Sequence, residues 1–123
     1  MMIEAARNQE GAEPATEFLD ALADSRSRKK RRYASDAALL LEEWARLGHL
    51  EHPLQQRQLR GDLWEVKTPA IRLPYYEFLD AVHGRIARLT HGFEKEFGKT
   101  VDGKTPHKHI NMGLWMIEED RKC

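Results

Sequence analysis

The chain has 123 residues, a length that predicts a single domain over 1–123 with a modest hydrophobic core. Its formal net charge is zero, with 33% charged and 41% hydrophobic residues, as in an ordinary soluble globular domain. Neutrality argues weakly against nucleic-acid binding, because domains that bind phosphate backbones usually carry a basic excess. The charge is uneven, however: residues 1–24 hold six acidic and one basic side chain, whereas residues 67–110 hold eight Lys or Arg and five acidic residues.

Cysteine content and hydropathy bear on the compartment. The single cysteine, Cys123, cannot form an internal disulfide or supply a thiolate zinc cluster. No apolar run approaches the roughly 20 residues that a membrane span needs, and the start lacks a signal-peptide core. We therefore expect a cytoplasmic protein without a membrane partner.

Two helices are predicted in the first half. Pro14 suits a first helical turn, and the apolar spacing after it predicts a short amphipathic helix over 15–23. A longer helix is predicted over 25–47, with Gly48 as its stop. Its N-cap candidates are Asp24, Ser25 and Ser27. Residues 1–7, ahead of both helices, are expected to be either an edge strand or a disordered end.

The first turns of the longer helix carry a basic run: Arg26, Arg28, Lys29, Lys30, Arg31 and Arg32. Cations at a helix N-terminus oppose the macrodipole, at a cost of roughly a few tenths of a kcal/mol each. Two interpretations remain open. The run is either a solvated face or a contact surface for nucleic acid or an acidic partner.

In the second half of the chain, apolar and polar residues alternate as they do in β-strands. Residues 51–62 are interpreted as a polar connector, and strands are predicted over 63–67, 70–78 and 85–92, with a turn over 81–84. On the middle strand, alternation places Ile71, Leu73 and Tyr75 on one face and Arg72, Pro74 and Tyr76 on the other. Since Pro74 lacks a ladder donor, that strand is expected to kink or to lie partly at an edge.

A last helix is predicted over 107–122, where Gly113 costs about 1 kcal/mol relative to Ala. The fold class is therefore α+β, with an N-terminal helical hairpin packed on a small antiparallel sheet and a C-terminal helix. The expected core contains Leu40, Trp44, Ile71, Leu73 and Ile86.

Basic side chains concentrated in the second half suit a polyanion: Lys67, Arg72, Arg85, Arg88, Lys95, Lys99 and Lys104. Arg grips phosphate through a planar fork, and Lys supplies a compact charge. His91 titrates near neutral pH, although a strand histidine is more often structural. Tyr76 is a candidate to donate a proton or to stack on a base. The i, i+2 pair His107 and His109 points to different sides of a helix, so no metal is expected.

Several short motifs follow one another along the chain. They are Leu63-Trp64-Glu65 on the first strand, Arg72 before two tyrosines on the second, His91-x-Phe93-x-Lys95 closing the third, and Lys104-Thr105-Pro106 before the last helix. In this order they resemble the RelE/ParE superfamily of bacterial toxins, specifically its HigB-like, phage-associated branch. The resemblance covers nearly the whole chain from about residue 15.

The resemblance implies the toxin of a type II toxin-antitoxin pair, a metal-independent, ribosome-associated mRNA endoribonuclease without a cofactor. Its partners would be the ribosome, mRNA and a cognate antitoxin, expected to be a helix-turn-helix protein. In such chemistry the RNA supplies its own 2′-hydroxyl nucleophile, and the enzyme moves protons and stabilises charge. By position, Arg72 corresponds to the phosphate-holding arginine, Lys67 to the basic residue of the preceding strand, and His91 and Lys95 to the His-x-Phe-x-Lys positions; Tyr76 completes the predicted catalytic set. Arg85, Arg88, Lys99 and Lys104 are predicted RNA contacts.

Two other functions stay open at the level of sequence. One is a ParE-like inhibitor that blocks a topoisomerase by contact; the other is an inactive phage-derived relative that acts only as a binding partner. Glu94 and Glu96 flank Lys95 and are expected to weaken the positive field there.

Overall fold

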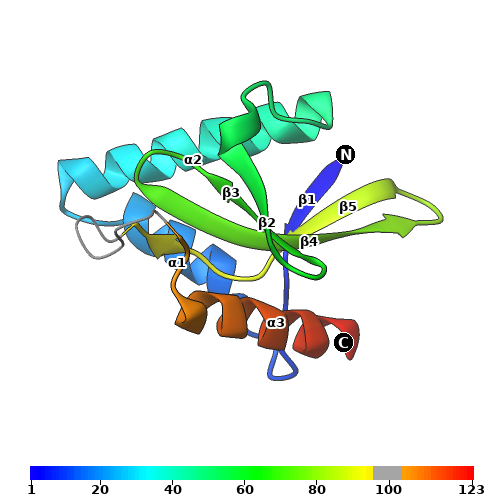
Figure 1. Ribbon diagram of the computed structural model, residues 1–123. Helices are drawn as coiled ribbons and strands as arrows, with labels where there is room; N and C mark the ends of the chain where they lie inside the picture. The colour runs from blue at the N-terminus through cyan, green and yellow to red at the C-terminus, as the bar shows by residue number, and fades with distance from the viewer. Residues whose placement is uncertain (96–103) are drawn as a thin grey trace.

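The computed structural model describes residues 1–95 and 104–123 (Figure 1). Its elements follow in the order β1 (Met2–Ala5), α1 (Pro14–Ala23), α2 (Arg28–Leu47), the short 3-10 helix η1 (Pro53–Gln55), β2 (Gln56–Arg60), β3 (Leu63–Lys67), β4 (Ile71–Asp80), β5 (Gly84–Leu89), β6 (Phe93–Glu94) and α3 (His107–Arg121). Within these described residues no helix is long and apolar enough to cross a bilayer.

The strands form one mixed sheet with the order β1-β5-β4-β3-β2, and β6 pairs with β4. Figure 1 shows α2 along one side of the sheet and α3 along the other. The α+β class is confirmed. The expectation that the chain starts with a helical hairpin on an antiparallel sheet is wrong, because β1 precedes both helices and pairs in parallel with β5. Of the two readings of residues 1–7, the edge strand is the one observed.

The sheet also contains a strand, β2, within the stretch 51–62 that was predicted to be a polar connector. Strand β2 pairs antiparallel with β3, and its residues include Arg57, Gln58 and Arg60. A polar edge strand lacks the apolar alternation that identifies half-buried strands, which explains why it was missed.

Two hydrophobic clusters flank the sheet. The larger one joins α1 and α2 to β3, β4 and β5, and in it Trp44 meets Tyr75 edge to face, with ring centroids 4.7 Å apart. The predicted core members Leu40, Trp44, Ile71 and Leu73 all belong to it. Ile86 is buried as predicted, but it pairs with Phe78 and is not a member of this cluster.

The second cluster packs α3 against the opposite face through Leu63, Tyr76, Ile110 and Ile117. Gly113 makes this close approach possible. A Cβ added at Gly113 would lie 2.7 Å from Leu63 Cδ1. The glycine that weakens the helix therefore lets α3 lie directly on β3.

Pro74 neither ends β4 nor puts it at an edge, since β4 runs unbroken between neighbours on both sides. In a strand the amide and carbonyl of one residue point the same way, and the Pro74 carbonyl accepts from the Thr90 amide at 2.8 Å. The missing donor therefore faces residues 90–92. Between the pairs Tyr75–Leu89 and Arg72–Phe93, these three residues lie opposite only two residues of β4, Leu73 and Pro74. This irregularity is a bulge.

Replacing Leu40 with Asp tests the core assignment. Leu40 is 6% exposed in the larger cluster, so a carboxylate there should cost about 3–5 kcal/mol of unfolding free energy. Its neighbour Leu39 is 64% exposed, and Leu39→Asp should cost no more than about 1 kcal/mol. Urea titration of both variants measures the difference, and equal midpoints would contradict the assignment.

Candidate functional site

Strands β3 and β4 place two cations side by side. Lys67 and Arg72 are directly opposed in the antiparallel register. The flanking residues of β4, Ile71 and Leu73, belong to the cluster under α1 and α2. Because side chains alternate along a strand, Lys67 and Arg72 lie on the face that α3 covers.

Strand β6 brings the His-x-Phe-x-Lys motif to the same face. Phe93 pairs with Arg72, and the Lys95 amide donates to the Ala70 carbonyl at 2.8 Å. The bulge opposite Pro74 shifts the alternation by one residue, so that His91 stands with Phe93. Their rings stack at 5.9 Å.

Gly92 occupies the opposite face, where only a hydrogen atom fits. A Cβ at this position would come within 2.3 Å of the Phe18 ring of α1. Glu94 also points to that side and lies 3.9 Å from the Lys30 ammonium. Glu94 was expected to weaken the positive field around Lys95, and its side chain lies on the face opposite Arg72. Glu96 and the predicted RNA contact Lys99 lie outside the described residues.

A buried carboxylate organises the cations. Glu65 is fully buried, and its Oε2 accepts from Arg57 Nε at 2.7 Å. The Thr105 hydroxyl donates to Glu65 Oε1 at 2.8 Å and accepts from Arg57 Nη2 at 2.9 Å. This Arg57–Glu65–Thr105 triangle joins β2 and β3 to the segment before α3.

The cations influence one another electrostatically. Burial lowers the pKa of Lys67, and the positive charges of Arg57, Arg72 and Lys95 lower it further, whereas Glu65 opposes the shift. Burial also lowers the pKa of Arg72. Arg72 Nη1 donates to the carbonyls of Thr68 at 2.6 Å and Ile71 at 3.1 Å, which fixes the guanidinium in place.

His91 is enclosed and stays neutral at pH 7. Its Nδ1 lies 2.9 Å from the Thr90 hydroxyl, and its Nε2 lies 3.3 Å from His109 Nδ1. Burial, with a smaller contribution from His109, lowers its pKa from 6.5 to about 4. His109 in turn stacks flat on Phe93, with centroids 3.6 Å apart. His91 is buried, whereas His109 is only partly buried.

Tyr76 lies on the face of Arg72 but is engaged elsewhere. Its hydroxyl donates to Asp120 near the end of α3, and burial raises its pKa to about 12. Arg88 joins the same network, donating to Asp120 at 2.9 Å and to Glu4 at 3.0 Å.

Arg85 lies on the other face, since its Nη1 donates to the Gly48 carbonyl at the end of α2 at 2.8 Å. The structure therefore gathers five of the predicted site residues on one face, namely Lys67, Arg72, His91, Lys95 and, at the rim, Lys104. Tyr76 and Arg88 share this face but bind Asp120 near the end of α3, and Arg85 lies on the other face, so none of the three joins the group.

Four residues of this site were not predicted: Arg57, Glu65, Thr105 and His109. Arg57 was hidden in the stretch assigned to a connector. Glu65 is two residues from Lys67, so strand alternation alone could have placed it on the same face. Thr105 and His109 gave no signal beyond the Lys-Thr-Pro motif and the paired histidines.

Around the site, a hollow of about 340 Å³ opens at Lys67 and Arg72, lined also by His52, Leu54 and Gln55. Among the residues that the structure describes, no three His, Cys, Asp or Glu side chains gather in a way that could hold a metal ion. The arrangement can bind a polyanion and move protons beside it. In comparisons with known proteins, no family model matches the chain and no curated protein matches it.

Replacing Arg57 with Ala should destabilise the fold, because the fully buried Glu65 carboxylate would lose its ion pair. We expect a loss of about 3 kcal/mol in unfolding free energy. Arg60 on the same strand is exposed, so Arg60→Ala should change stability by only about 0.5 kcal/mol. Thermal and urea unfolding of both variants tests the triangle. Equal loss in the two would show that Glu65 does not depend on Arg57.

The lowered pKa of His91 has a consequence for stability. The unfolded histidine binds its proton near pH 6.5 and the folded one near pH 4, so stability is complete above about 6.5 and falls as the pH drops towards 4. An NMR titration of the imidazole should give the folded value. In His91→Gln, the decrease in melting temperature over this window should become smaller, and an unchanged decrease would contradict the assignment.

Proposed function

We propose that this protein is the toxin of a type II toxin-antitoxin pair and cleaves messenger RNA on the ribosome without a metal. The observation that carries the proposal is the direct cross-strand pair of Lys67 and Arg72. Like charges directly opposite each other on neighbouring strands are destabilising. Because both side chains are half-buried, the pair does not stabilise the fold, which suggests that it serves to bind an anion. A phosphate bound between them removes the repulsion.

The chemistry follows from the positions of the side chains. Arg72, fixed by two carbonyls, offers its remaining donors to the scissile phosphate, and Lys95 adds positive charge beside it. Lys67 has a lowered pKa and is suited to give a proton to the leaving 5′-oxygen. The attacking group is the ribose 2′-hydroxyl of the RNA itself.

We assign acceptance of the 2′-hydroxyl proton to His109. It is stacked on Phe93 next to Arg72, and His91 holds its Nδ1 at 3.3 Å. His91 itself is enclosed, so its part in the proposal is to position His109. Tyr76, Arg85 and Arg88 are left out of the proposed machinery because their polar groups are engaged away from Arg72.

The same basic face is where we place the antitoxin. An acidic segment that neutralises Lys67, Arg72 and Lys95 would mask the proposed catalytic surface directly. Such association is steered by charge and weakens as salt screens it. In this arrangement, antitoxin and RNA compete for the same cations.

Arg72→Ala should abolish growth arrest and lower RNA cleavage by about a hundred- to a thousandfold, because one preorganised donor to a charged transition state is lost. Arg85 is an exposed arginine on the opposite face, and Arg85→Ala should cleave like the parent. Primer extension on ribosome-bound message, with thermal melts of both variants, makes the comparison.

Undiminished cleavage by a folded Arg72→Ala protein would overturn the proposed site. No cleavage by the parent would favour a contact inhibitor of a topoisomerase, or an inactive relative, over a nuclease. A DNA-supercoiling assay with a purified bacterial topoisomerase then separates the contact inhibitor from the inactive relative.

A further inference from the structure

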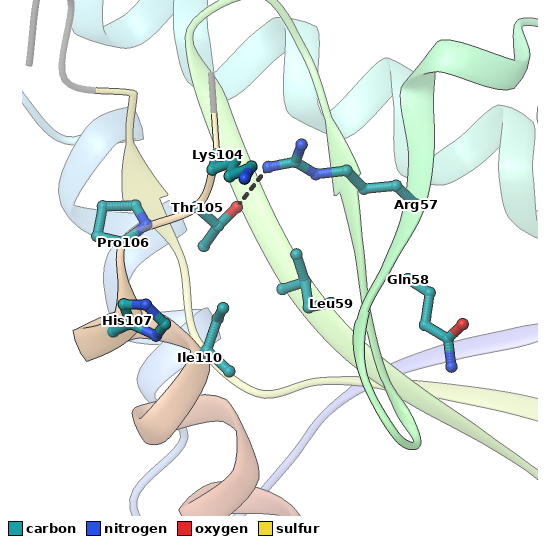
Figure 2. Close-up of a pocket in the computed structure, with 8 residues that line it drawn as sticks. All are labelled: Arg57, Gln58, Leu59, Lys104, Thr105, Pro106, His107 and Ile110. Carbon is teal, nitrogen blue, oxygen red and sulfur yellow. Dashed lines mark hydrogen bonds between the residues drawn. The ribbon is translucent and has the colours of Figure 1, made fainter. Parts of the chain in front are cut away.

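A second cavity lies next to the cation cluster. It has a volume of about 460 Å³ and runs between β2 and the start of α3. Figure 2 shows the residues that line it, with Arg57, Gln58 and Leu59 on the β2 side and Lys104, Thr105, Pro106, His107 and Ile110 on the α3 side. The volume falls in the range of about 300–1,000 Å³ that is usual for small-ligand sites.

The cavity combines an apolar interior with a basic rim. Leu59, Pro106 and Ile110 supply flat or branched apolar surface, and Lys104 and His107 stand at its edge (Figure 2). Its ligand should therefore have a ring that stacks on apolar groups and a negative charge nearby. A nucleotide has both features, since its base has an apolar face and its ribose carries a phosphate.

Arg57 connects this cavity to the proposed cleavage site. Its side chain lines the cavity and lies within electrostatic reach of Lys67 and Arg72, whose pKa values it lowers. The Arg57–Glu65–Thr105 triangle fixes that side chain between the two places. A base in the cavity would thus belong to a nucleotide whose phosphate lies at the cations.

We propose that the cavity between β2 and α3 is a nucleobase subsite, which holds one unstacked base of the RNA next to the phosphate bound by Lys67 and Arg72. The inference rests on the proposed function for the identity of the polymer. The base-binding site needs only a single nucleotide to fill it, so binding to it is measurable without RNA cleavage.

The experiment is an NMR titration of the uniformly labelled protein with adenosine and uridine 5′-monophosphates, and with ribose 5-phosphate as the ligand that lacks a base. At least one nucleotide should bind about tenfold or more tightly than ribose 5-phosphate, because base stacking is lost in the latter. The amide signals of Leu59, Thr105 and Ile110 should shift with the nucleotides and not with ribose 5-phosphate.

Leu59→Trp fills the cavity and should reduce nucleotide affinity to that of ribose 5-phosphate. Its control is Leu79→Trp, which adds the same ring at a residue 80% exposed on β4, away from the cavity. Leu59→Ala removes apolar contact surface from the same wall of the cavity and covers the case in which Leu59→Trp does not fold. It should weaken nucleotide binding about threefold or more and leave ribose 5-phosphate binding unchanged.

Equal affinity for nucleotides and ribose 5-phosphate, or shifts that avoid the cavity, would overturn the subsite. Nucleotide binding in the cavity by a protein that cleaves no RNA would support the subsite and remove the proposed cleavage. RNA cleavage by a protein that shows no base-dependent binding would support the proposed cleavage and overturn the subsite. The two proposals therefore fail in different ways.

Discussion

The candidate site depends on one buried carboxylate. Glu65 has no exposed surface, and an ion in such a place is tolerated only when it is paired and hydrogen-bonded. Arg57 supplies the pair and Thr105 the hydrogen bond. The charge of Glu65 also opposes the lowering of the pKa of Lys67 and of Arg72. One group thus fastens the segment before α3 to the sheet and makes a cluster of cations tolerable.

Pro74 and the bulge beside it decide which side chains meet those cations. Leu89 faces the cluster under α1 and α2, and regular alternation from it would turn His91 to that same face. The extra residue in 90–92 reverses the alternation, so that His91 and Phe93 meet His109 of α3. Bulges commonly redirect a side chain in this way. Here the bulge leaves no β4 amide without a partner, because Pro74 has no N–H to donate on the side that faces residues 90–92.

The sequence predicted most of the helices and strands, but only part of the way in which they pack together. Apolar periodicity and capping signals located α1, α2, β3, β4, β5 and α3 within a few residues, and strand alternation placed Arg72 on the face opposite Ile71 and Leu73. The parallel pairing of β1 was beyond such reasoning, because it depends on contacts between residues more than 80 positions apart. Alternation also placed Tyr76 on the same face as Arg72. It does not show which residues of a neighbouring helix each side chain meets, and in the structure the Tyr76 hydroxyl binds Asp120 of α3.

Helix α3 is held at both ends by polar contacts and in the middle by close packing. Asp120 binds Tyr76, Arg88 and the Arg7 amide near its C-terminus, and Thr105 binds Glu65 just before its N-terminus. Between them Gly113 rests on Leu63. A helix fixed in this manner cannot slide along the sheet without breaking a buried hydrogen bond. Both the stack of His109 on Phe93 and the width of the cavity beside β2 are therefore set by the sheet, and an agent that displaced α3 would dismantle the proposed base seat and proton acceptor together.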